Sequence, residues 1–204
     1  MLFDDTYTIP AKSGHALFKD RGSKFFAYAF VVFTEGDIKK CLDELKKQYP
    51  DATHHCYAWI LNPDKSAQRA NDDGEPANTA GKPILRQILS KGLTNTLVVV
   101  VRYFGGTLLG AGGLITAYGE AAKLALEDAG KEEKQIEGVF EAVYDYGVEN
   151  DVFRFLRTLG GNISSVDKQE KATVSFTVRK SKVEEVNNLW HDFRNFELKF
   201  IGYQ

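Results

Sequence analysis

Three acidic side chains lie close together in one polar segment of the sequence, Asp72, Asp73 and Glu75. Carboxylates at this spacing could hold a hard cation through their oxygens, or one of them could act as a general base. The alternative is turn and helix-capping chemistry, which the neighbouring Gly74 and Pro76 favour. The ligand spacing is too short for an EF-hand, and we predict no metal site here.

A glycine-rich segment, 102–113, is the second candidate site. It follows the apolar run 96–101 and precedes a stretch with helical periodicity, 114–128, so we expect a strand, a loop and a helix. Amides at the start of that helix could hold an anion. The segment lacks the Lys-Ser/Thr pair of a P-loop, and tight strand–helix packing is the alternative use of its glycines. The candidate binding residues of the two segments are Asp72, Asp73, Glu75, Thr79, Arg102, Tyr103, Gly105, Gly106, Gly110, Gly112 and Gly113.

Arg102 connects these two candidates. Its backbone follows a run of valines, so its charge sits at the mouth of a buried strand and needs a partner or solvent. The three carboxylates are the natural partners. We therefore predict that the acidic segment and the glycine segment meet with Arg102 between them, and we assign no catalytic residue.

His54, His55 and Cys56 are a third group of chemically active side chains. On a strand, alternation places His54 and Cys56 on one face and His55 on the other. A zinc site would need two further ligands near that face. A packed core with one hydrogen-bonded imidazole is the favoured interpretation, and a Cys–His nucleophilic pair is disfavoured because side chains two apart on a strand rarely align for proton transfer.

The composition describes a globular chain of 204 residues with a formal net charge of -2, so bulk charge does not favour non-specific attraction to phosphates. Two cysteines are too few for a disulfide framework and indicate a reducing compartment. The N-terminal residues lack the basic start and apolar run of a signal peptide, and no apolar run reaches membrane-spanning length. We therefore expect a cytoplasmic protein without a membrane segment.

The periodicities predict an α+β chain of two domains, 1–134 and 135–204, joined by a charged linker at 131–135. Thr79 is expected to cap a helix that runs to about Lys91. In the second domain the order of elements is βαββαβ, the ferredoxin-like arrangement. The expected strands are 6–10, two strands within 14–33, 54–61, 96–101, 138–146, 162–169, 172–179 and 197–203. The expected helices are 37–49, 79–91, 114–128, 149–159 and 182–193, and 62–78 is expected to be a long polar loop.

Three blocks of sequence carry a family resemblance: Asp72–Pro76, Thr79–Pro83 and Arg102–Gly106, the last followed by Leu109-Gly110 and Gly112-Gly113-Leu114. In their order and spacing the chain resembles the IMPACT family over essentially its full length. The resemblance implies a first domain whose sheet carries helices on one side, like the second domain of a small-subunit ribosomal protein. It implies a second domain similar to the last domain of elongation factor G. Eukaryotic relatives act in translational control, where they compete for the activator of a starvation-responsive initiation-factor kinase.

The chain departs from the family pattern at two places. Asn78 stands where many relatives have Gly, although Asn tolerates a positive φ. The neighbourhoods 107–108 and 115–116 lack basic residues that relatives often carry.

The leading functional hypothesis is a translation-associated regulatory binding protein, non-enzymatic and without a cofactor, which contacts RNA, the ribosome or a translation factor. One alternative is an enzyme that acts on a small phosphorylated or carboxylated metabolite through the glycine-rich loop. Another is a protein-interaction module whose second domain controls access to the first. Base stacking on Phe140, Tyr144 and Phe176 of the second domain is a disfavoured further option.

Overall fold

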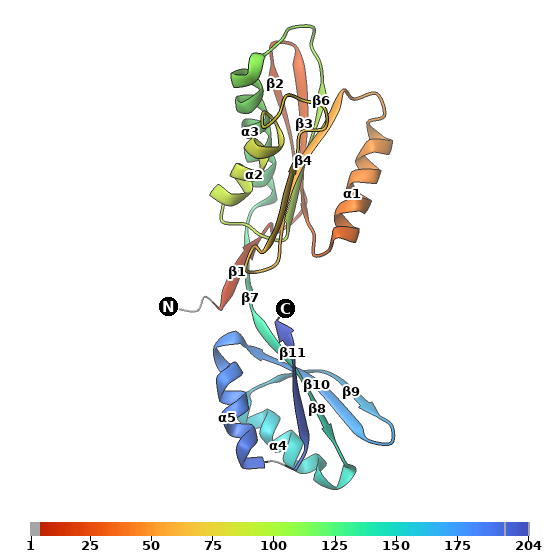
Figure 1. Cartoon of the computed structure of the whole chain (residues 1–204), viewed down its shortest axis with the longest axis vertical. Helices are drawn as coiled ribbons and strands as arrows, with labels where there is room; N and C mark the ends of the chain where they lie inside the picture. The colour runs from red at the N-terminus through yellow and green to blue at the C-terminus, as the bar shows by residue number, and fades with distance from the viewer. Residues whose placement is uncertain (1–4, 194, 204) are drawn as a thin grey trace. The chain divides into compact units, whose positions relative to one another are not determined.

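The computed structural model describes residues 5–193 and 195–203 and divides into two compact units. One unit is Tyr7–Lys134, and the other comprises residues 135–203 with Asp5 and Thr6. Each unit has its own sheet and its own hydrophobic core (Figure 1). The mixed α+β class expected from the sequence is confirmed.

The first unit is built on an antiparallel five-stranded sheet of order β2-β3-β6-β4-β5. Its strands are β2 (Gly14–Asp20), β3 (Ser23–Val31), β4 (His54–Leu61), β5 (Ala67–Asn71) and β6 (Thr96–Tyr103). Its helices are α1 (Glu35–Gln48), α2 (Gly81–Ser90) and α3 (Gly110–Ala129). A two-residue turn, Arg21-Gly22, joins β2 to β3 with φ of 43° and 84°, as a tight hairpin requires.

Helices cover both faces of this sheet, which corrects the expectation that they lie on one side. Figure 1 shows α2 and α3 against one face and α1 against the other. The cause is that β6 is apolar on both faces: Val98 and Val100 pack with α2 and α3, whereas Val99 packs with the α1 residue Leu45. A strand of this kind needs cover on each side.

Three further boundaries differ from the sequence prediction. The segment 62–78 is not a continuous loop, because it contains β5, which pairs with β4. The segment predicted to be a linker, 131–135, contains β7 (Glu132–Gln135), which pairs with β1 (Thr6–Ile9). Helix α3 begins at Gly110, so the last glycines of the glycine-rich segment are already helical.

The second unit has the predicted βαββαβ order. Its four-stranded antiparallel sheet has the order β11-β8-β10-β9, and its core joins the sheet to both α4 and α5. The strands are β8 (Glu137–Tyr144), β9 (Asn162–Lys168), β10 (Ala172–Arg179) and β11 (Glu197–Tyr203). The helices are α4 (Glu149–Leu159) and α5 (Val183–Phe193), preceded by the short 3₁₀ turns η1 (Tyr146–Val148) and η2 (Lys180–Lys182).

The three aromatic residues considered for base stacking lie inside this second core. Phe140, Tyr144 and Phe176 are at most 1% exposed, because they belong to the strand faces that pack against the helices. A buried ring cannot stack on a base, so the stacking role considered for these residues is wrong.

Candidate functional site

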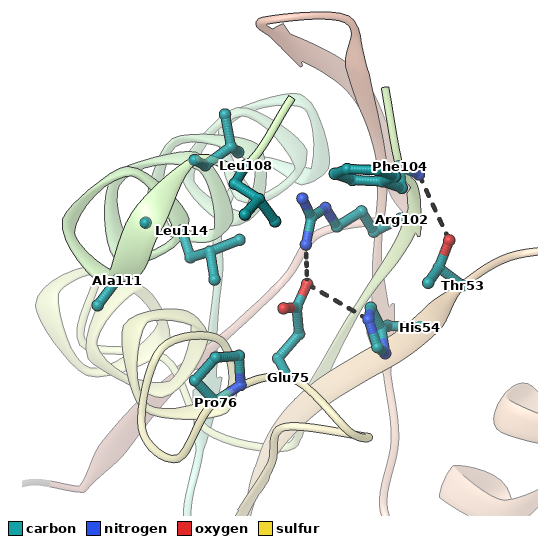
Figure 2. Close-up of a pocket in the computed structure, with 11 residues that line it drawn as sticks. Thr53, His54, Glu75, Pro76, Arg102, Phe104, Leu108, Ala111 and Leu114 are labelled. Carbon is teal, nitrogen blue, oxygen red and sulfur yellow. Dashed lines mark hydrogen bonds and ion pairs between the residues drawn. The ribbon is translucent and has the colours of Figure 1, made fainter. Parts of the chain in front are cut away.

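The ends of β4 and β6 and the acidic segment meet at one buried point of the first unit. Along β6, Arg102 lies on the same face as Val98 and Val100, the face covered by α2 and α3. His54 is the register partner of Arg102 on β4. The segment between β5 and α2 places Glu75 opposite both side chains (Figure 2). The predicted contact between Arg102 and one of the three carboxylates is therefore present.

Glu75 is the centre of this network. Its Oε1 accepts a hydrogen bond from Arg102 Nη1 at 2.5 Å and another from the Tyr118 hydroxyl at 2.7 Å. His54 Nε2 lies 3.8 Å from the same oxygen. Arg102 and Glu75 are 5% and 9% exposed, so their opposite charges neutralise each other away from water. The guanidinium also lies over the rings of Phe25 and Phe104, at 5.5 and 5.6 Å.

Cys56 and Tyr118 extend the network into the core. The Cys56 thiol donates to the carbonyl of Asp72 and lies 3.3 Å from the Tyr118 hydroxyl. Burial raises the pKa of Cys56 and of Tyr118 well above their ordinary values. Both groups therefore stay protonated at neutral pH, and the thiol is a poor nucleophile.

The other two acidic residues, Asp72 and Asp73, bond backbone amides. Asp72 Oδ1 accepts from the amides of Ala80 and Gly81 at 3.0 and 2.8 Å, which caps α2. Asp73 Oδ2 accepts from the amide of His55. The predicted Thr79 cap is wrong, since the Thr79 hydroxyl donates to the carbonyl of residue 76 and α2 has no side-chain cap from its own N-cap residue.

The candidate residues of the glycine-rich segment do not form one site but lie in different parts of the first unit. Tyr103 points to the α1 face, opposite to Arg102. Gly105 packs on the β2–β3 turn, where a Cβ would lie 1.9 Å from the carbonyl carbon of Gly22. Gly106 has a φ of 83°. Gly112 and Gly113 belong to the first turn of α3.

An apolar hollow of about 420 Å³ lies between the buried ion pair and the start of α3. Figure 2 shows Leu108 and Leu114 across it from Arg102 and Glu75. Leu108 is 83% exposed at the rim. The lining residues are Thr53, His54, Glu75, Pro76, Arg102, Phe104, Leu108, Leu109, Gly110, Ala111 and Leu114. Of the candidates predicted from sequence, Glu75, Arg102 and Gly110 line this hollow.

Sequence reasoning missed several residues of this site. Phe104 and Leu108 flank glycines of the segment, and their apolar side chains carry no chemical signal that marks a site. Tyr118 stands four residues after Leu114, so both lie on the same face of α3, and this spacing could have identified it. His54 was considered as a metal ligand, but its Nδ1 bonds the carbonyl of Asp73 at 2.7 Å.

Residues 5–193 and 195–203 also bear on metal binding and on membrane association. No group of three or more His, Cys, Asp or Glu side chains in this part of the chain is arranged to hold a metal ion. None of its helices combines the length and apolarity needed to cross a bilayer.

The chain is a two-unit α+β protein with sequence blocks around an apolar hollow. Comparison with known proteins identifies the family to which this class of protein corresponds. The model of the Impact N-terminal domain matches residues 21–126. The chain is 32% identical to the IMPACT family member YigZ of Escherichia coli, over 98% of this chain and 99% of that one. The chain belongs to the IMPACT family, as the resemblance indicated.

Further matches differ in how much of the chain they cover. The IMPACT family member YvyE of Bacillus subtilis is 37% identical over 140 residues, which span 69% of this chain and 64% of that relative. A crystal structure titled as a hypothetical protein matches with a TM-score of 0.74 and 30% identity, over 99% of both chains. The structure titled as the two-domain translational regulator Yih1 matches 63% of this chain at 32% identity, with a TM-score of 0.38.

Proposed function

We propose that this chain is a translation-associated regulatory binding protein, non-enzymatic, which contacts the ribosome through the apolar hollow beside Arg102. Membership of the IMPACT family and the translational control that the resemblance implies for eukaryotic relatives support the role in translation. Because family membership alone does not show how a protein binds its partner, the binding mode has to be argued from the residues of the site.

The observation that carries the proposal is that the polar groups of the hollow bind one another. The carboxylate of Glu75 accepts hydrogen bonds from Arg102 and Tyr118, and the Cys56 thiol, which does not line the hollow, is held neutral by burial. A general base or a nucleophile needs a free, correctly ionised group. What remains for a partner is the apolar rim, where Leu108 and Phe104 are 83% and 47% exposed, a composition typical of a docking site.

Co-sedimentation of the full chain with ribosomes at several salt concentrations tests this proposal. We expect binding at low salt and about tenfold weaker binding for Leu108→Glu, which places a charge on the rim. Leu89→Glu is the matched control, because Leu89 is an exposed leucine of α2 outside the hollow. Absence of co-sedimentation, or equal losses for the two variants, would contradict the proposal.

The alternative of an enzyme that acts on a small phosphorylated metabolite is tested separately. A ligand present at 100 times its Kd stabilises a protein by about 2.7 kcal/mol. We expect no change in Tm with nucleotides and Mg²⁺, since the hollow presents a neutralised ion pair and apolar side chains. A nucleotide-dependent rise in Tm that Leu108→Glu removes would favour the enzyme.

A further inference from the structure

The side of the first sheet that faces α1 is partly exposed, and it is separate from the apolar hollow beside Arg102. Helix α1 covers the sheet over β4 and β6, where Ile38 and Leu45 pack in a cluster with Trp59 and Val99. On β2 and on the outer part of β3 the side chains of this face remain partly or largely open. Such a face is available to a partner.

Two lysines stand next to each other on this face. Lys19 of β2 is the register partner of Lys24 of β3, and Tyr103 of β6 is the next residue across the sheet. Directly opposed like charges destabilise a pair of strands. The one acidic residue of β2 and β3, Asp20, lies on the opposite face by alternation and pairs with Arg21 at 3.6 Å. An anion bound at the two lysines would offset their repulsion.

Aromatic rings surround a hollow beside these lysines. Tyr49, which follows α1, stacks on Phe26 with ring centroids 5.5 Å apart and planes at 26°. Tyr103 meets Phe26 edge to face at 6.0 Å. The residues lining the hollow are Gly22, Lys24, Phe26, Tyr49, Tyr103 and Phe104. We call Lys19, Lys24, Phe26, Tyr49 and Tyr103 the lysine–aromatic face.

The chemistry of this face selects one class of ligand. Aromatic rings alone would also suit a cationic ligand, but the ammonium group of Lys24 in the lining opposes a second positive charge. Rings for stacking beside lysines for phosphates are the combination with which proteins bind single-stranded nucleic acid. Because a base must be unstacked to enter an aromatic hollow, a continuous duplex is a poorer ligand.

We propose that the lysine–aromatic face binds single-stranded RNA, with one base in the aromatic hollow and the adjoining phosphates at Lys19 and Lys24. This inference rests on the proposed function and deepens it, since it names RNA as one ribosomal component that the chain contacts. The RNA would bind on the α1 side of the sheet, whereas the apolar hollow beside Arg102 lies on the α2 and α3 side. Phe104 lines both hollows.

Fluorescence anisotropy of the full chain with a 12-nucleotide single-stranded RNA, over a salt series, tests the inference. Each lost phosphate contact lowers the slope of log K against log salt by about 0.7 for a single strand. We therefore expect Lys24→Gln to weaken binding and reduce the slope by this amount. Tyr103→Leu keeps an apolar side chain but loses stacking, so we expect about tenfold weaker binding with the slope unchanged.

Lys123→Gln is the matched control, because Lys123 is a lysine of α3 on the other side of the sheet. The inference is overturned if the RNA does not bind, if the duplex form binds as tightly, or if Lys123→Gln has the effect of Lys24→Gln. Ribosome co-sedimentation of the same variants separates the two proposals. If the wild-type chain does not bind the RNA while it still binds ribosomes in a way that depends on Leu108, this inference alone is refuted.

Discussion

The buried pair of Arg102 and Glu75 is the residue-level feature with the largest expected effect on the first unit. Both side chains are removed from water, and they form an ion pair with each other. Removing one partner of such a pair leaves an uncompensated buried charge. The pair therefore holds the acidic segment against the end of β6 and shapes the apolar hollow.

Glu75→Gln should destabilise the protein by about 3–5 kcal/mol, the usual cost of breaking a buried ion pair. Glu120→Gln, which breaks an exposed pair with Lys123, should change stability by less than about 1 kcal/mol. Urea unfolding measures both. Adding Arg102→Met to Glu75→Gln should cost less than the sum of the single changes, because both remove the same interaction. Strict additivity would show that the pair is not coupled.

Gly105 and Gly112 provide a matched comparison of two glycines in one segment. A Cβ at Gly105 would overlap the backbone of Gly22, whereas a Cβ at Gly112 would meet nothing within 4 Å. Gly105→Ala should therefore lower Tm markedly. Gly112→Ala should raise the stability by up to about 1 kcal/mol, the helix preference of Ala over Gly. Equal effects in thermal unfolding would contradict this use of the two glycines.

The sequence allowed the contact of Arg102 with a carboxylate to be anticipated, because a charge that follows buried valines needs a partner. It did not reveal which carboxylate. Asp72, Asp73 and Glu75 are chemically alike, and the choice depends on a turn in which the Glu75 amide bonds the Asp72 carbonyl. That turn directs the Asp72 side chain to α2 and the Glu75 side chain to Arg102, which is a tertiary outcome.

At the scale of elements, α2 depends on a side chain outside it. Burial acts to raise the pKa of Asp72, but hydrogen bonds from the amides of Asn78, Gly81 and Ala80 lower it below the ordinary value. Asp72 therefore contributes stability that is present above the ordinary Asp pKa of about 3.9. This contribution is lost as the pH falls through the lower pKa of the folded state.

Asp72→Asn should reduce stability at pH 7 by about 1 kcal/mol, in the range of a lost N-cap. The difference in unfolding free energy between wild type and variant should narrow below about pH 4, where the Asp72 carboxylate is protonated first in the unfolded state and, at lower pH, in the folded state. Asp43→Asn, at an exposed position of α1, is the control for the change in net charge. A difference that stays constant from pH 7 to pH 3 would refute the capping role of the ionised carboxylate.

Regular elements with strong periodicity were predictable, and β4, β10 and β11 have the expected bounds. Strands β5 and β7 were missed because their sequences, Ala67–Asn71 and Glu132–Gln135, are polar. What makes them strands is pairing with a partner, β4 or β1, and local sequence does not encode such pairing strongly. The two-sided cover of the first sheet was likewise hidden, although the continuous valines of β6 indicate burial on both faces.

At the scale of the whole molecule, we propose that the two units are separate domains, because each encloses its own core. The chain has two tryptophans, and Trp59 belongs to the first unit while Trp190 belongs to the second. Trp190→Phe therefore leaves a fluorescent reporter of the first unit, and Trp59→Phe leaves one of the second.

In these two backgrounds, Glu75→Gln distinguishes independent domains from a single cooperative structure. The substitution breaks a pair inside the first unit. We therefore expect it to lower the urea midpoint reported by Trp59. The midpoint reported by Trp190 should be unchanged within experimental error. If both midpoints fall together, the units unfold as one, and the two units cannot be varied separately. If only the first falls, variants of the hollow and of the lysine–aromatic face can be interpreted as changes within one domain.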